Sequence, residues 1–129
     1  MLAGGMPTHA EAVTLFERRR QAWLREDLTG YLDLWADDMS FASPVHTEPL
    51  CGRDAFGDLV RQSLAFSRPL RFNVERVAVD GDWVLAEWEI TIVRRVDGRE
   101  ITWRGMSVCR IRDGRITEWR EYWNPTALA

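Results

Sequence analysis

The chain predicts an α+β domain in which three N-terminal helices pack on a strongly bent antiparallel sheet. Apolar residues recur at helical spacing through the first half, and three Asp-Gly pairs separate alternating segments in the second half. Helices followed by consecutive hairpins are typical of this class. The length of 129 residues suits one domain. We therefore expect a single domain over residues 8–129, preceded by a flexible tail at residues 1–7.

Two helices are expected first. Thr8 can cap a helix that runs to about residue 25, with its apolar side chains on one side and Arg19 near the middle of that side. Asp27 can cap a second helix over residues 28–37. Pro44 and Pro49 then predict an irregular loop, and a third helix is expected to open just after it and to end near Phe66.

Four strands fill the rest of the chain, and they are expected at residues 70–79, 83–95, 99–112 and 115–123. Because strand side chains alternate, each strand presents two different faces. One face of the sheet is rich in Glu and Arg, which suits ion pairs that face water or another subunit. The other face should be covered by the helices, and it carries Trp88, Ile90, Ile92, Trp103, Trp119 and Trp123.

Glu121 lies between two tryptophans of this aromatic face. Trp119, Glu121 and Trp123 point the same way from the last strand. Burial disfavours the charged carboxylate, so the pKa of Glu121 should rise unless a cation lies nearby. A carboxylate in such a setting is suited to general acid or base chemistry.

The order of elements and several short motifs resemble the nuclear transport factor 2-like superfamily, which includes ketosteroid isomerases, limonene epoxide hydrolases, scytalone dehydratases and SnoaL-like polyketide cyclases. The resemblance covers nearly the whole chain. Its motifs are the segments 34–38, 44–49, 52–55, 113–116 and 119–123. The resemblance implies a cone-shaped fold of the cystatin-like α+β barrel type, with a pocket between helices and sheet and often with dimerisation through the outer sheet face.

The catalytic residues of these relatives are mostly replaced. Where the resembling isomerases have an aspartate base, an oxyanion-hole tyrosine and a protonated aspartate, this chain has Ser43, Arg19 and Ser107. The tyrosine and asparagine that hold water in the epoxide hydrolases correspond to Phe41 and Ser43, and their central arginine and aspartate fall near Trp88 and Ile90. Only their last-strand aspartate has a counterpart, Glu121.

Three residues are the candidate catalytic groups. Arg19 and Glu121 should look into the same pocket and can pair, either as a base or ligand anchor with its partner or as a structural ion pair. His46 lies in the loop that should border the pocket mouth, where it is either an auxiliary proton carrier or an exposed loop histidine. The candidate ligand-binding residues are Trp23, Phe41, Ser43, Trp88, Trp103, Ser107, Trp119 and Trp123. The indoles either line the pocket or fill it.

Composition excludes several functions. No lysine is present, so Schiff-base catalysis through a lysine is impossible. Two distant histidines and two cysteines without ligand spacing predict no metal site, and no phosphate-binding glycine loop or other cofactor motif is present. The net charge of −3, with acids and arginines intermixed, argues against a nucleic-acid partner. No membrane span or signal peptide is visible, so a cytoplasmic protein is expected.

These features favour a cofactor-free acid–base enzyme of the isomerase, cyclase, dehydratase or hydrolase-like kind. Its expected ligand is a small hydrophobic polyketide, terpenoid or steroid-like molecule, and its expected assembly is a homodimer. The alternative is a non-catalytic ligand-binding or dimeric interaction module of the same fold. The loss of the isomerase residues favours this alternative.

Overall fold

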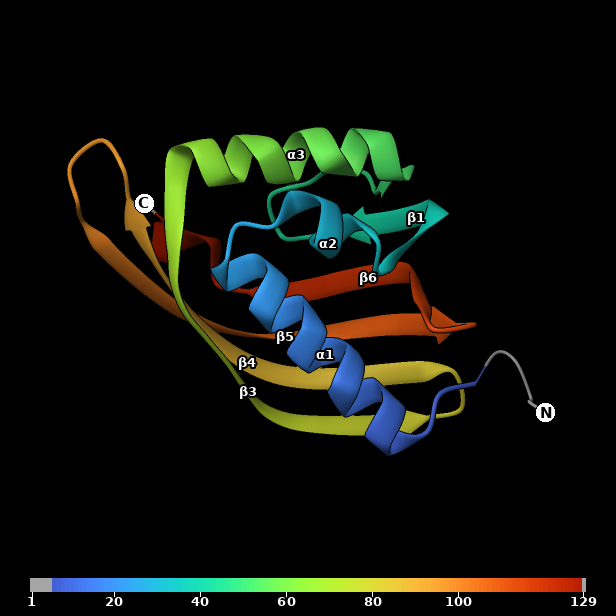
Figure 1. Ribbon diagram of the computed structural model, residues 1–129. Helices are drawn as coiled ribbons and strands as arrows, with labels where there is room; N and C mark the ends of the chain where they lie inside the picture. Colours follow the sequence, from blue (N-terminus) through green and yellow to red (C-terminus); the bar gives the residue numbers. More distant parts are fainter. Residues whose placement is uncertain (1–5, 129) are drawn as a thin grey trace.

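The computed structural model describes residues 6–128 (Figure 1). Residues 1–5 of the expected tail lie outside this range. The elements are, in chain order, α1 (His9–Leu24), α2 (Leu28–Leu32), β1 (Trp35–Ala42), β2 (Leu50–Cys51), α3 (Arg53–Phe66), β3 (Ser67–Asp80), β4 (Trp83–Arg94), β5 (Glu100–Arg112), β6 (Arg115–Trp123) and the 3₁₀ turn η1 (Pro125–Leu128).

The strands form one curved sheet in the order β2-β1-β6-β5-β4-β3. The last four strands in the chain form consecutive antiparallel hairpins. All three helices lie on the same face of this sheet, with α1 crossing β3 and α3 lying beside β1 (Figure 1). The expected α+β cone with three helices on a bent sheet is therefore confirmed.

The second helix is shorter than predicted, and a strand takes its place. The helix ends at Leu32, and β1 starts at Trp35 in a segment that the sequence assigned first to a helix and then to a loop. The strand runs parallel to β6, so the sheet is mixed rather than wholly antiparallel. Trp35, Met39 and Phe41 are buried. Apolar spacing near residue 35 fits both structures, and pairing with β6 decides for the strand because it satisfies the backbone groups.

The predicted caps and turns are present. The Thr8 hydroxyl accepts the N–H of Glu11 at 3.1 Å, and the Glu11 carboxylate accepts the N–H of Thr8 at 2.9 Å. This reciprocal arrangement is a capping box that begins α1. Asp27 accepts the N–H of Gly30 at 3.0 Å and begins α2. The hairpin between β5 and β6 turns at Gly114, whose φ of 76° favours glycine.

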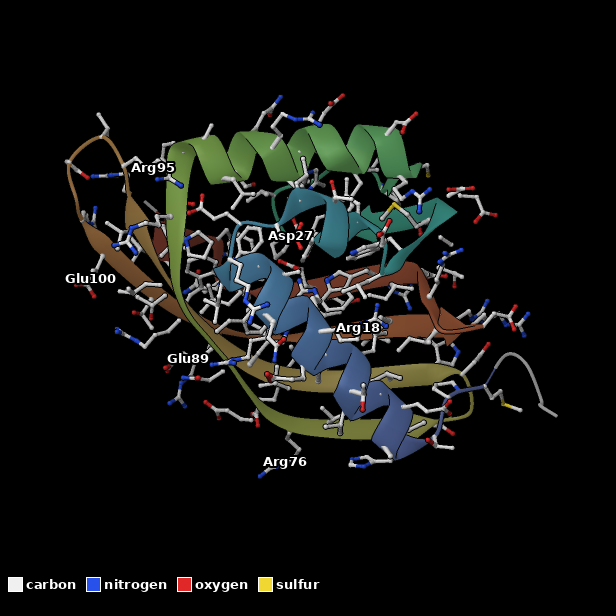
Figure 2. The ribbon with its side chains drawn as sticks, in the orientation of Figure 1. Arg18, Asp27, Arg76, Glu89, Arg95 and Glu100 are labelled. Carbon is white, nitrogen blue, oxygen red and sulfur yellow. The ribbon has the colours of Figure 1, made fainter. Side chains whose placement is uncertain are left out.

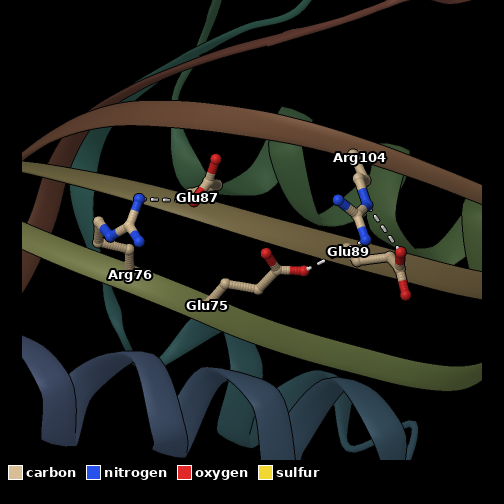
Figure 3. Close-up of polar contacts among 5 residues, drawn as sticks. All are labelled: Glu75, Arg76, Glu87, Glu89 and Arg104. Atoms are coloured by element: carbon tan, nitrogen blue, oxygen red, sulfur yellow. Dashed lines mark hydrogen bonds and ion pairs between the residues drawn. The ribbon is translucent and has the colours of Figure 1, made fainter.

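The two faces of the sheet differ as predicted. The outer face carries cross-strand ion pairs, among them Arg104 with Glu89 at 2.9 Å and Arg76 with Glu87 at 3.4 Å (Figure 3). Charged side chains surround the molecule in Figure 2, which labels Arg18 on α1 among others. The inner face and the helices enclose the apolar core. Its largest fully buried side chains are Trp35, Trp88 and Trp119.

Candidate functional site

Glu121 lies on the inner face of β6, opposite Ser107 of β5. The Nε1–H group of Trp119 donates to Oε1 of Glu121 at 2.8 Å, and that of Trp123 donates to Oε2 at 2.6 Å. One indole therefore holds each carboxylate oxygen, and the two together fix the plane of the group. Each oxygen has two lone-pair positions, so each keeps one position for a ligand.

Burial raises the pKa of the Glu121 carboxyl above its ordinary value. The hydrogen bonds from the two indoles and the positive charges of Arg19 and His46 act in the opposite direction, but burial has the larger effect. The residue as a whole is half-buried, and its carboxyl is the part enclosed by aromatic rings. The result is a rigidly held carboxyl group with an increased affinity for a proton, which suits acid–base catalysis.

A depression of ≈ 330 Å³ adjoins this carboxyl group. Its lining residues are Ala42, Ser43, Pro44, Arg120, Glu121, Tyr122 and Trp123. Ser43 Oγ lies 2.7 Å from Nδ1 of His46, and the His46 ring contacts Phe41 edge to face with 5.6 Å between centroids. The end of β1 and the loop after it thus carry Phe41, Ser43 and His46 to the same end of the sheet as Glu121.

A second and larger depression, of ≈ 470 Å³, lies between α1 and β3. Two of its polar side chains already have partners, because Arg20 Nε donates to the Phe72 carbonyl at 2.8 Å and His9 Nε2 lies 3.1 Å from the Val77 carbonyl oxygen. It contains no buried carboxyl group. The smaller depression at Glu121 is therefore the better candidate for a reaction site.

Arg19 does not form the ion pair with Glu121 that the sequence suggested. Its guanidinium is 7% exposed and lies over aromatic rings, with Cζ 4.4 Å from the centroid of the Trp119 ring and 5.0 Å from that of Phe72. No salt bridge joins Arg19 to a carboxylate within residues 6–128. The indoles of β6 take the place that the arginine was expected to occupy beside Glu121.

Tyr31 of α2 is buried in the same region, and it was not among the candidate site residues. Its ring lies 5.4 Å from Cζ of Arg19, and burial raises the pKa of its hydroxyl. The phenol is therefore neutral over the physiological range. A hydroxyl-bearing aromatic residue on an otherwise apolar helix face was the available signal.

The remaining candidates divide by burial. Trp88 donates from Nε1 to Oγ of Ser107 at 3.2 Å, and both side chains are fully buried in the core. Trp23, Trp103 and Trp123 are only partly buried. Some indoles therefore fill the core, and others reach its edge.

No group of three or more His, Cys, Asp or Glu side chains in the described part of the chain is arranged to hold a metal ion. Within the same residues, no helix combines the length and apolar character that crossing a bilayer requires. Cys51 and Cys109 are both free thiols.

Residues 16–119 match the SnoaL-like domain family, and the chain belongs to this family. None of the curated proteins matches the chain. Among solved structures, a Bacillus subtilis protein provisionally called an isomerase is 24% identical, with a TM-score of 0.84 over 95% of this chain and 92% of that one. An LEH-like epoxide hydrolase of M. tuberculosis is 23% identical, with a TM-score of 0.79 over 94% and 88% of the two chains. These similarities confirm the nuclear transport factor 2-like fold.

Proposed function

We propose that this protein is a cofactor-free acid–base enzyme that acts on a small hydrophobic ligand bearing a carbonyl or hydroxyl group. The observation that carries the proposal is the Glu121 carboxyl group, which lines a depression while two indole N–H groups hold it. A rigid, partly desolvated carboxyl group next to open space is the usual arrangement for a general base or acid. The similar structures called an isomerase and an epoxide hydrolase agree with this class of chemistry.

In the proposed reaction, the Glu121 carboxylate removes a proton from the carbon next to a ligand carbonyl. The C–H electron pair moves into a new C=C bond, and the carbonyl oxygen takes the negative charge. The neutral Glu121 carboxyl then returns the proton to another carbon or to a leaving oxygen. His46 is the auxiliary proton carrier in this proposal, because its Nδ1 lies 2.7 Å from Oγ of Ser43, which lines the depression.

Deuterium exchange tests this proposal without knowledge of the natural substrate. The protein is incubated in D₂O with 2-tetralone, a bicyclic ketone with acidic hydrogens, and mass spectrometry follows deuterium uptake. We expect exchange above the buffer rate, and Glu121→Gln should remove about 10²- to 10⁴-fold of that acceleration. The control is Glu118→Gln, because Glu118 lies on the outer face of the same strand, 3.6 Å from Arg120. Equal rates for the wild type and Glu121→Gln would contradict the proposal.

A non-catalytic ligand-binding or interaction module is the second candidate. The fully buried Trp35, Trp88 and Trp119 favour it, because they fill much of the interior that a substrate would otherwise occupy. Saturable tryptophan quenching by 2-tetralone, without exchange above the buffer rate, would support this candidate over the enzyme.

We also propose that the protein forms a homodimer through the outer face of the sheet. Met106 and Tyr122 are 45% and 57% exposed on this face, beside the ion pairs of Figure 3. Sedimentation equilibrium checks the assembly, and a dimer that Tyr122→Glu dissociates is the expected result.

A further inference from the structure

Arg19 is a buried cation without a matching anion. Its side chain reaches from α1 into the core and is 7% exposed, and its Nε and Nη1 atoms have no hydrogen-bond partner. A guanidinium group remains charged at any physiological pH. Burying a charge is costly unless it is paired and hydrogen-bonded, so the position of Arg19 calls for an explanation.

Aromatic rings surround this cation, and they cannot supply what it lacks. Cζ of Arg19 lies 4.4 Å from the centroid of Trp119, 5.0 Å from that of Phe72 and 5.4 Å from that of Tyr31. The faces of these rings attract a cation. The hydroxyl of Tyr31 is the one oxygen that these three side chains carry, and it interacts with Arg19. Nε and Nη1 of Arg19 still have no acceptor.

Two further donors without acceptors lie around the same tyrosine. The Trp23 ring is 5.6 Å and the Trp35 ring 6.2 Å from Tyr31, between centroids. The indole nitrogen of each is buried and has no partner. We call Arg19, Trp23, Tyr31 and Trp35 the donor cluster. Three of its members thus present N–H groups, and nothing in residues 6–128 accepts a hydrogen bond from these nitrogens.

Two carboxylates on the elements that carry Arg19 and Trp119 have other partners. Both oxygens of Glu121 accept indole N–H groups of β6, and Glu17 on α1 pairs with Arg20 at 3.3 Å. Trp119 connects the donor cluster to Glu121, because its ring lies 4.4 Å from Cζ of Arg19 and its Nε1–H group donates to Oε1 of Glu121 at 2.8 Å.

We propose that the donor cluster binds an anionic oxygen of the ligand and that Arg19 forms the ion pair with it. The substrates are then small aromatic or polycyclic carboxylates or acidic enols. This inference rests on the proposed function, because it names the substrate class for the site that contains Glu121. The anion supplies the acceptors that Arg19 lacks, and the surrounding rings pack against the ligand's apolar body. Charge-assisted hydrogen bonds are stronger than those between neutral groups, so the site should bind a charged ligand much more tightly than a neutral one.

A matched pair of probes tests the preference. Binding of 2-naphthoate and of 2-naphthamide, which is similar in shape but neutral, is measured by isothermal titration calorimetry at pH 7. We expect the wild type to bind the carboxylate at least tenfold more tightly than the amide. In Arg19→Gln the ratio should fall to within twofold, whereas Arg18→Gln, at an exposed position of the same helix (Figure 2), should keep the wild-type ratio. Equal affinities in the wild type, binding of neither probe, or an unchanged ratio in Arg19→Gln would overturn the proposal.

A second variant separates ligand binding from a structural role. Arg19→Met keeps apolar volume among the rings and removes the unpaired charge, so we expect it to melt at the wild-type temperature or above and to lose the preference for naphthoate. A lower melting temperature with the preference retained would mean that Arg19 orders the core. If either variant fails to fold, the ratio of naphthoate to naphthamide affinity in the wild type still tests the proposal.

Failure of this inference and failure of the proposed function give different results. Glu121→Gln should keep the naphthoate preference while it loses deuterium exchange. Exchange that depends on Glu121 without any carboxylate preference would refute the anion site alone. A preference for naphthoate without deuterium exchange would support the anion site and indicate a non-catalytic ligand-binding protein.

Discussion

The two indole N–H groups that donate to Glu121 should lower the pKa of its carboxyl group, and removing one of them tests this effect. Trp123→Phe removes the donor 2.6 Å from Oε2 and leaves a ring that can still pack on Trp103, whose centroid is 6.0 Å away. A hydrogen bond to a charged group contributes about 1.5–3 kcal/mol and one to a neutral group about 0.5–1.5 kcal/mol. The ionised form of Glu121 therefore loses about 1–1.5 kcal/mol more than the protonated form, which corresponds to roughly tenfold weaker ionisation.

Carbon-13 NMR of the glutamate side-chain carboxyl groups measures this effect, and Glu121→Gln identifies the signal by its absence. We expect the pKa of Glu121 to be higher in Trp123→Phe than in the wild type. Trp103→Phe is the matched control, because the Trp103 indole neighbours Trp123 but its Nε1 has no partner. An unchanged or lower pKa in Trp123→Phe, or an equal rise in Trp103→Phe, would refute the reasoning.

Three further predictions concern the core and its titratable groups. Gly105→Ala should destabilise the fold by about 1–3 kcal/mol in urea unfolding, because an added Cβ would lie 2.6 Å from Cη2 of Trp88; unchanged stability would contradict this packing. Burial raises the pKa of Cys109 to about 12, so one equivalent of Ellman's reagent should react in the native protein, at exposed Cys51, and two after denaturation; rapid reaction of both native thiols would argue against it. The pKa of Glu121 is higher in the folded protein than in the unfolded chain, where it is about 4.3. The carboxyl therefore stabilises the fold at pH values below the unfolded-state pKa, and this stabilisation is lost as pH rises through the folded-state pKa. The melting temperature of Glu121→Gln relative to the wild type should therefore increase with pH in that window, and a constant difference would exclude the linkage.

Local signals explain why much of the fold was predictable. The capping box at Thr8 and the turn at Gly114 depend on residues close in the chain, and both form as expected. The alternation along β6 likewise placed Glu121 between two indoles on one face. Each of these features follows from backbone geometry within a few residues.

Other features depended on partners far away in the chain. Residues 35–42 carry apolar spacing that fits a helix as well as a strand, and the parallel pairing with β6, more than seventy residues later, selects the strand. The sequence allowed Arg19 to pair with Glu121, because both were placed on inward faces. The distances between elements instead place its guanidinium over aromatic rings and leave the carboxyl to the indoles.

The sequence by itself determined the α+β class, the hairpins and the inward face that carries Glu121, because caps, turns and alternation act locally. Only the tertiary structure decided that β1 joins the sheet beside β6 and that Arg19 lacks an anion, because strand pairing and side-chain distances depend on how separate elements pack.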